Sequence, residues 1–176
     1  MARVAVRAPV SGLAYPLVHL TEAEVSTEME GLCAALRRSI DSITREWVDR
    51  VKADSYLDSD DPLTLSQLID HIPQMLEELC SLLARGGEPD FKSARAASSH
   101  GYARSLEGYS LTELLRELEL LRECVFDFVA DSEAEHGAGR EATVRALRVV
   151  NKYFAEDIIF VVEHYLRRNA RTLNKP

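Results

Sequence analysis

Five histidines are the residues with which metal or haem chemistry could begin in this sequence. A di-metal carboxylate bundle needs two Glu-x-x-His motifs on facing helices, and the only such spacing runs from Glu133 to His136, in a glycine-flanked loop. His71 and His100 remain as candidate axial haem ligands or small-molecule contacts, although a hydrogen-bonded structural histidine is the commoner situation for both. We therefore expect no metal site and no required cofactor.

Nucleophilic catalysis finds no support in the motifs. A Gly-x-Ser-x-Gly elbow and a glycine-rich phosphate loop are absent, and no histidine is followed by the Asp or Glu that marks a phosphoacceptor site. The three cysteines, Cys33, Cys80 and Cys124, have no CxxC spacing and lie among apolar residues, which is typical of reduced packing cysteines. We expect a protein with no catalytic residues, hence not an enzyme.

Two charged residues fall on apolar helix faces. At 100° per residue, Arg122 lies about 40° from Leu118, and Asp157 lies about 60° from Phe154. A charge that faces a core needs a partner. We predict that Arg122 contacts Asp157, with a glutamate from another helix as second choice; the alternative is that Arg122 reaches solvent at the edge of the bundle.

His100 and Arg104 form a second polar pair, because residues four apart are neighbours on a helix face. The connection from Glu107 to Tyr109 is too short to cross a domain, so the helix carrying the pair should pack against the one that follows, near Glu117. His100 either fixes the register of these helices or reports protonation or ligand state.

These residues need helices to position them, and the composition predicts helices. The chain has 176 residues, 46% of them hydrophobic, with only 8 Gly and 6 Pro, which fits one helical domain better than a β-sandwich or barrel. We expect a flexible arm over residues 1–20, one helical domain over 21–168 and a basic tail over 169–176.

Capping boxes and apolar stripes place the helices. Thr21 with Glu24 begins one long helix whose stripe continues to Val51, and Ser110 with Glu113 begins another. Between them, a proline at position 73 either kinks a helix or follows a new start at His71, capped by Asp70. The remaining elements are a helix ended by Gly86-Gly87, a small-residue helix over 91–106, a loop over 132–139 and a final helix that includes residues 144–165. The prediction is an all-α bundle of about five to six helices, for which a globin-like arrangement is one option.

Net charge and hydropathy limit the classes of partner that this chain could bind. A net charge of −8 disfavours binding to phosphate backbones, and the longest apolar run, Ile158–Val162, is far too short to span a membrane. We therefore expect a cytoplasmic protein with no nucleic-acid or membrane partner. The last helix carries a second apolar stripe of Val149, Tyr153 and Phe160, which predicts a homodimer through this helix.

Several short motifs resemble a known family. They are His100-Gly101-x-x-Arg104, the Gly-Tyr-Ser-Leu of 108–111, the Leu-Leu and Leu-Arg pairs of 114–122, the Leu-x-Asp-x-x-Pro-x-x-Leu of 68–76, and Trp47. Over about residues 25–166 the chain resembles the N-terminal sensory domain of RsbR/RsbRD-type regulators, which also precedes some bacterial sensor histidine kinases. The resemblance implies an all-α, often dimeric input domain that passes a signal to a following output domain.

Two departures from that family qualify the resemblance. Glu117 is followed by Leu118 where an aromatic residue is expected, and no STAS, kinase or other output domain follows residue 176. The chain is then either an input domain cut from a longer protein or a stand-alone regulator that acts on a partner. Our leading hypothesis is a non-enzymatic signalling domain that relays movement of its last helix; the alternative is a helical sensor that binds haem or another small molecule.

Overall fold

The computed structural model describes residues 21–57, 69, 71–86, 110–135 and 139–173. In these residues it has five α-helices and no strand: α1 (Glu22–Arg38), α2 (Ile40–Ala53), α4 (Ile72–Ala84), α6 (Leu111–Glu135) and α7 (Arg140–Leu173). The prediction of an all-α bundle is confirmed, while the globin-like arrangement stays a prediction. His100, Arg104, the arm at 1–20 and the predicted helix at 91–106 lie outside the described residues.

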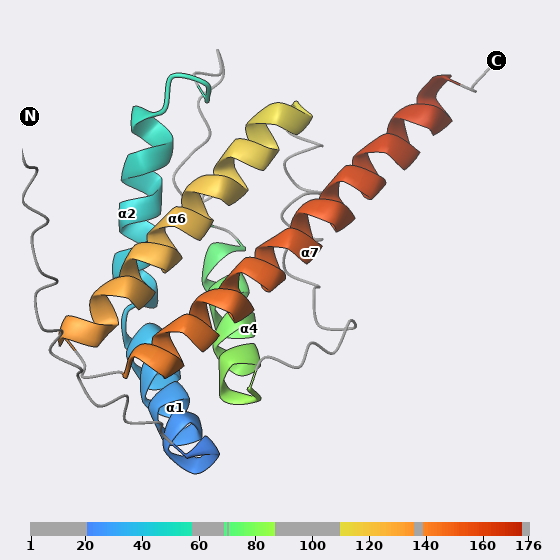
Figure 1. The fold of residues 1–176 in the computed structure, drawn as a ribbon. Helices are drawn as coiled ribbons and strands as arrows, with labels where there is room; N and C mark the ends of the chain where they lie inside the picture. Colours follow the sequence, from blue (N-terminus) through green and yellow to red (C-terminus); the bar gives the residue numbers. More distant parts are fainter. Residues whose placement is uncertain (1–20, 58–68, 70, 87–109, 136–138, 174–176) are drawn as a thin grey trace, which may run out of the picture.

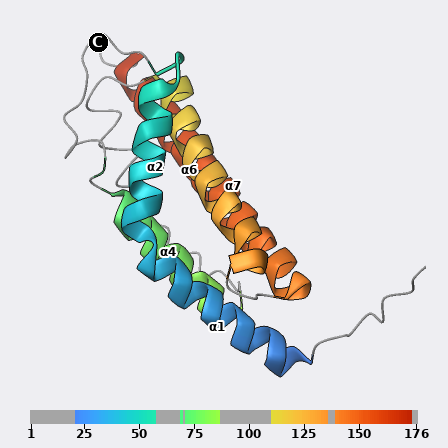
Figure 2. The same ribbon diagram turned by 90° about the vertical axis from the view of Figure 1, so that its left-hand side faces the viewer.

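The helices form two layers around one core. α6 and α7 run side by side in opposite directions, and α1, α2 and α4 make the other layer (Figures 1 and 2). α1 packs mainly on α4, and α2 mainly on α6. Each of the five described helices supplies a large, fully buried side chain to the core: Leu36, Trp47, Leu76, Leu121 and Phe154.

The predicted single helix from Thr21 past Val51 is wrong, because the chain turns at Ser39. The Ser39 backbone has φ −101° and ψ 2°, and its N–H is shared between the carbonyls of Ala35 at 3.1 Å and Leu36 at 3.0 Å. Such a shared bond tightens the end of α1. The bend, visible in Figure 2, lets α1 follow α4 while α2 follows α6, so both halves of one apolar stripe stay buried.

Local signals placed the helix ends well. Both capping boxes are present: Thr21 and Glu24 exchange hydrogen bonds at the start of α1, and Ser110 and Glu113 do so before α6. α4 begins one residue after His71 with the proline at position 73 in its first turn. Gly86, with φ +73°, follows the end of α4 in the left-handed region that favours glycine.

Two predicted boundaries differ from the structure. α6 continues to Glu135, so the first half of the loop predicted at 132–139 is helical. Ser132 in this stretch is buried, and its hydroxyl donates a hydrogen bond to the Phe128 carbonyl at 2.8 Å. α7 continues to Leu173, so most of the basic tail predicted at 169–176 is helical. Among the described helices, none combines the length and hydropathy that a membrane crossing requires.

Candidate functional site

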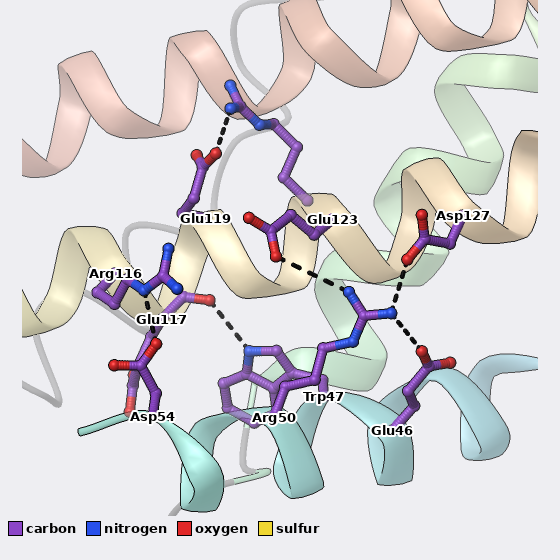
Figure 3. Close-up of polar contacts among 10 residues, drawn as sticks. Glu46, Trp47, Arg50, Asp54, Arg116, Glu117, Glu119, Glu123 and Asp127 are labelled. Carbon is purple, nitrogen blue, oxygen red and sulfur yellow. Dashed lines mark hydrogen bonds and ion pairs between the residues drawn. The ribbon is translucent and has the colours of Figure 1, made fainter. Parts of the chain in front are cut away.

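The interface between α2 and α6 carries a row of polar contacts around a buried tryptophan. Trp47 is fully buried, and its indole Nε1–H donates to the backbone carbonyl of Glu117 at 3.0 Å (Figure 3). A buried indole N–H usually finds such an acceptor. This contact fixes the register of α2 on α6, because its donor and its backbone acceptor lie on the two different helices.

Arg50 ties the same two helices together at their exposed edge. Its guanidinium contacts Glu46 on its own helix at 2.5 Å, and Asp127 at 2.6 Å and Glu123 at 3.8 Å on α6. The hydrogen bond to Asp127 raises the pKa of Arg50, so the group stays cationic. Arg50 therefore works as a clamp between α2 and α6.

A second cross-link closes the other end of this interface. Arg116 of α6 meets Asp54, the residue that ends α2, at 2.8 Å. The backbone N–H of Tyr56 donates to the same carboxylate at 2.9 Å. Both hydrogen bonds lower the pKa of Asp54, and the bond from the Tyr56 N–H has the larger effect. Asp54 thus links the end of α2 to both α6 and the following turn.

Arg122 does not meet Asp157, so that predicted pair is wrong. The guanidinium instead pairs with Glu119, three residues earlier on α6, and lies 5.8 Å from the ring centroid of Phe126. Both members of the ion pair are partly exposed. The second choice, a glutamate from another helix, is also not the partner; the side chain stays at the edge of the bundle, as in the solvent-reaching alternative.

Glu117 is fully buried on α6. Sequence reasoning singled it out as the neighbour of His100 and Arg104, and both of these residues lie outside the described part of the chain. Its backbone carbonyl is the acceptor for Trp47. Glu117 is thus a buried acid whose backbone joins α6 to α2.

Asp157 is fully buried on α7, and neither of its carboxyl oxygens accepts or donates a hydrogen bond. Its polar neighbours are Tyr153, one turn earlier, and Glu78 of α4; the Tyr153 hydroxyl donates to Glu78 Oε2 at 3.4 Å, a long contact. Burial, reinforced by the negative charge of Glu78, raises the pKa of Asp157 to about 8, and the nearby Tyr153 hydroxyl opposes this only in part. Asp157 is therefore protonated at neutral pH.

The second apolar stripe of α7 is only partly a surface. Val149 and Tyr153 are buried within the chain itself, and the dimer interface through this helix stays a prediction. Phe160 is 43% exposed and stacks on His164 with ring centroids 6.3 Å apart. Ile159 and Leu166, at 59% and 58%, are further exposed apolar residues of α7.

His71 precedes α4 and is partly buried. The groove of about 480 Å³ between α2 and the start of α4 is lined by other described residues: Asp41, Thr44, Arg45, Val48, Asp49, Lys52, Ile69 and Pro73. The three cysteines are free and buried, and burial raises the pKa of Cys80 and of Cys124 to about 12. Among the described residues, no group of three or more His, Cys, Asp or Glu could hold a metal ion.

Sequence reasoning did not identify Arg50, Asp54 and Glu78, nor the acids that pair with Arg50 and Arg122. Arg50 follows Glu46 by four residues, which signals only the local half of its contacts. Glu78 lies three residues after Met75 and four before Leu82, at the edge of the buried face of α4, and that spacing could have identified it.

Comparison with known proteins agrees with the resemblance in the sequence. A family model described as the RsbT co-antagonist protein RsbRD N-terminal domain matches residues 41–174, from the first turn of α2 to beyond the end of α7. The comparisons with curated proteins and with solved structures gave no significant match. The matched family is one of regulatory signalling domains, and this chain belongs to the RsbRD N-terminal domain family.

Proposed function

We propose that this chain is a non-enzymatic input domain of bacterial signal transduction, which dimerises and passes a signal through α7 to an output domain or partner protein. The family supports the regulatory role. The family is named for a co-antagonist of RsbT, so a kinase or STAS-type regulator is the kind of partner proposed. A cytoplasmic location is part of the same proposal.

The geometry of α7 is the observation that carries the proposal. α7 has 34 residues, more than any other described helix, and its C-terminal turns extend past the rest of the bundle (Figure 1). It packs against α6, α1 and α4, and most of its buried residues lie in its first half. A helix that is anchored in a core at one end and free at the other can transmit a small shift or rotation to whatever it contacts.

The exposed apolar residues of α7 supply the proposed dimer contact. Ile159 and Leu166 are seven residues apart and so share one face, and Phe160 lies about 100° around the helix from Ile159. Hydrophobic side chains of this size exposed together mark an interaction surface. A second copy of α7 packed in the two-fold arrangement common for homodimers would cover them.

Light scattering on the purified chain tests the dimer. Phe160→Glu places a charge in the proposed contact, and we expect the mass to fall from dimer to monomer with unchanged helicity. Asn151→Glu is the matched control, because residue 151 is exposed and lies about 180° around α7 from residue 160. A monomeric wild type, or a dimeric Phe160→Glu variant, would contradict the proposal.

The relay requires a partner assay. We expect the wild-type chain to bind RsbT or a STAS-domain regulator in a pull-down, and substitutions near the free end of α7 to weaken that binding while leaving the fold intact. Leu166→Glu is the variant to compare, since Leu166 is exposed and far along α7. Binding that is equal in the wild type and in Leu166→Glu would argue against α7 as the output element.

A second candidate function is small-molecule binding, and the groove between α2 and α4 is the observation that favours it. Its volume of about 480 Å³ suits a small ligand. Haem is tested by the visible spectrum of the purified protein: a Soret band that persists through gel filtration would favour this candidate and make His71 and His100 the ligands to substitute. A featureless spectrum would remove haem and favour the input domain.

A further inference from the structure

An acid without a hydrogen-bonding partner lies where α7 contacts α4. Asp157 is fully buried, both of its oxygens lack hydrogen bonds, and the neighbouring acid, Glu78, comes from the facing helix. A carboxylate ion in such a place would face a large desolvation penalty and the repulsion of Glu78. The closed contact therefore requires Asp157 to carry a proton.

The groups around Asp157 come from two helices. Tyr153 and Glu156 belong to α7, and Glu78 belongs to α4; Glu78 and Glu156 favour the neutral acid, whereas the Tyr153 hydroxyl favours the ion. α1 and α6 also pack on α7, but in the described part of the chain no titratable group of either helix is near enough to shift the pKa of Asp157. In particular, Arg122 of α6 is engaged with Glu119. None of the described groups that shift the pKa of Asp157 is a cation that would stabilise the ionised form.

We propose that Asp157 is a proton-operated latch, which holds α7 against α4 while protonated and releases this contact when it ionises. The α4–α7 contact is much smaller than the α6–α7 contact, so α7 can separate from α4 and remain packed on α6. Water would then reach Asp157, Glu78 and Tyr153 together. The latch makes the proton a signal for the helix movement, and this consequence rests on the proposed function of α7.

The direction of the pH dependence follows from proton counting. In the closed contact Asp157 keeps its proton up to about pH 8, whereas an exposed aspartate loses it near 3.8. Between about pH 4 and about pH 8 the closed form therefore binds more protons than the open form. Its stability relative to the open form falls as pH rises through this range. Within that range the open population grows about tenfold per pH unit, and above it the dependence levels off.

Hydrogen exchange and carbon NMR on the full chain test the latch. After correction for intrinsic exchange, we expect the protection of α4 amides near Glu78 to fall about a hundredfold between pH 5 and pH 7, while α6 amides change little. Asp157→Asn, which imitates the neutral acid, should remove this dependence, and Asp131→Asn, at an exposed site on α6, should keep it. A dependence that persists in Asp157→Asn would overturn the proposal.

The carbon NMR measurement needs no variant and so does not depend on the folding of Asp157→Asn. The Asp157 carboxyl carbon in the wild type should titrate well above pH 6, and a midpoint near 4 would overturn the latch. Both measurements report a contact within one chain, so a monomeric wild type would contradict the proposed dimer and leave the latch standing. Conversely, loss of the latch would leave the dimer and partner assays unaffected.

Discussion

The Nε1–H of Trp47 on α2 donates a 3.0 Å hydrogen bond to the backbone carbonyl of Glu117 on α6, and both residues are fully buried. The contact joins residues 70 positions apart in the sequence. Because a backbone carbonyl cannot move without its helix, the bond sets the axial position of α2 against α6. Arg50 and Arg116 then fasten the two helices on either side (Figure 3).

Trp47→Phe should destabilise the fold modestly and Trp47→Ala severely. The phenylalanine removes the hydrogen bond, which is worth about 1 kcal/mol, and some packing; the alanine adds a large cavity, for a total of about 3–5 kcal/mol. Urea denaturation followed by circular dichroism measures both free energies of unfolding. Equal losses in the two variants would show that the hydrogen bond to Glu117, which both variants lose, rather than packing decides the stability here.

Arg122→Met should change the free energy of unfolding by less than about 1 kcal/mol. Its ion pair with Glu119 is partly exposed and lies within one helix, and such pairs contribute little. Arg50→Met is the comparison, because Arg50 bridges α2 to two acids of α6 and should cost more. A larger loss of unfolding free energy for Arg122→Met than for Arg50→Met would contradict this and indicate that Arg122 takes part in a buried ion pair.

The thiols should be unreactive in the folded protein. With a pKa of about 12, Cys80 and Cys124 are thiolates in only about one molecule in ten thousand at pH 8, and all three cysteines are buried. A disulfide reagent such as DTNB should label no thiol until denaturant is added, and then three per chain. Fast labelling of one thiol in native protein would reveal a local opening.

The lowered pKa of Asp54 predicts that the protein loses stability in acid. Its pKa is lowered by the Tyr56 N–H and by Arg116, so its contribution is complete above the ordinary carboxyl value of 3.8 and is lost as pH falls through the lowered value. Asp54→Asn should therefore be less stable than wild type at pH 6 and converge with it in acid. Melting temperatures of the wild type and Asp54→Asn from pH 6 into acid measure this difference, and a constant difference at every pH would contradict the prediction. The pH dependence has the opposite sign to that expected for Asp157.

Much of the fold was predictable because its signals are local. The capping boxes at Thr21 and Ser110 need residues only three positions apart, and the stripes that buried Leu36, Leu76 and Leu121 follow from helical spacing. Asp157 was also identified by spacing as a charge near the core. The bend at Ser39 was not, since one unbroken stripe fits a straight helix until α4 and α6 draw its two halves apart.

The sequence by itself determined the helical class, the capped starts of α1 and α6, the buried faces and the family, because each depends on residues within a few turns of one another or on short motifs. Only the tertiary structure decided which charges meet. Arg122 pairs with Glu119 on its own helix, and Arg50 pairs with Asp127 on another helix. Asp157 lies near another acid, Glu78, instead of near a cation. It also decided that Tyr153 faces inward and Phe160 outward. Pairing and burial depend on where separate helices come to rest, and helical periodicity shows which face is apolar without showing what covers it.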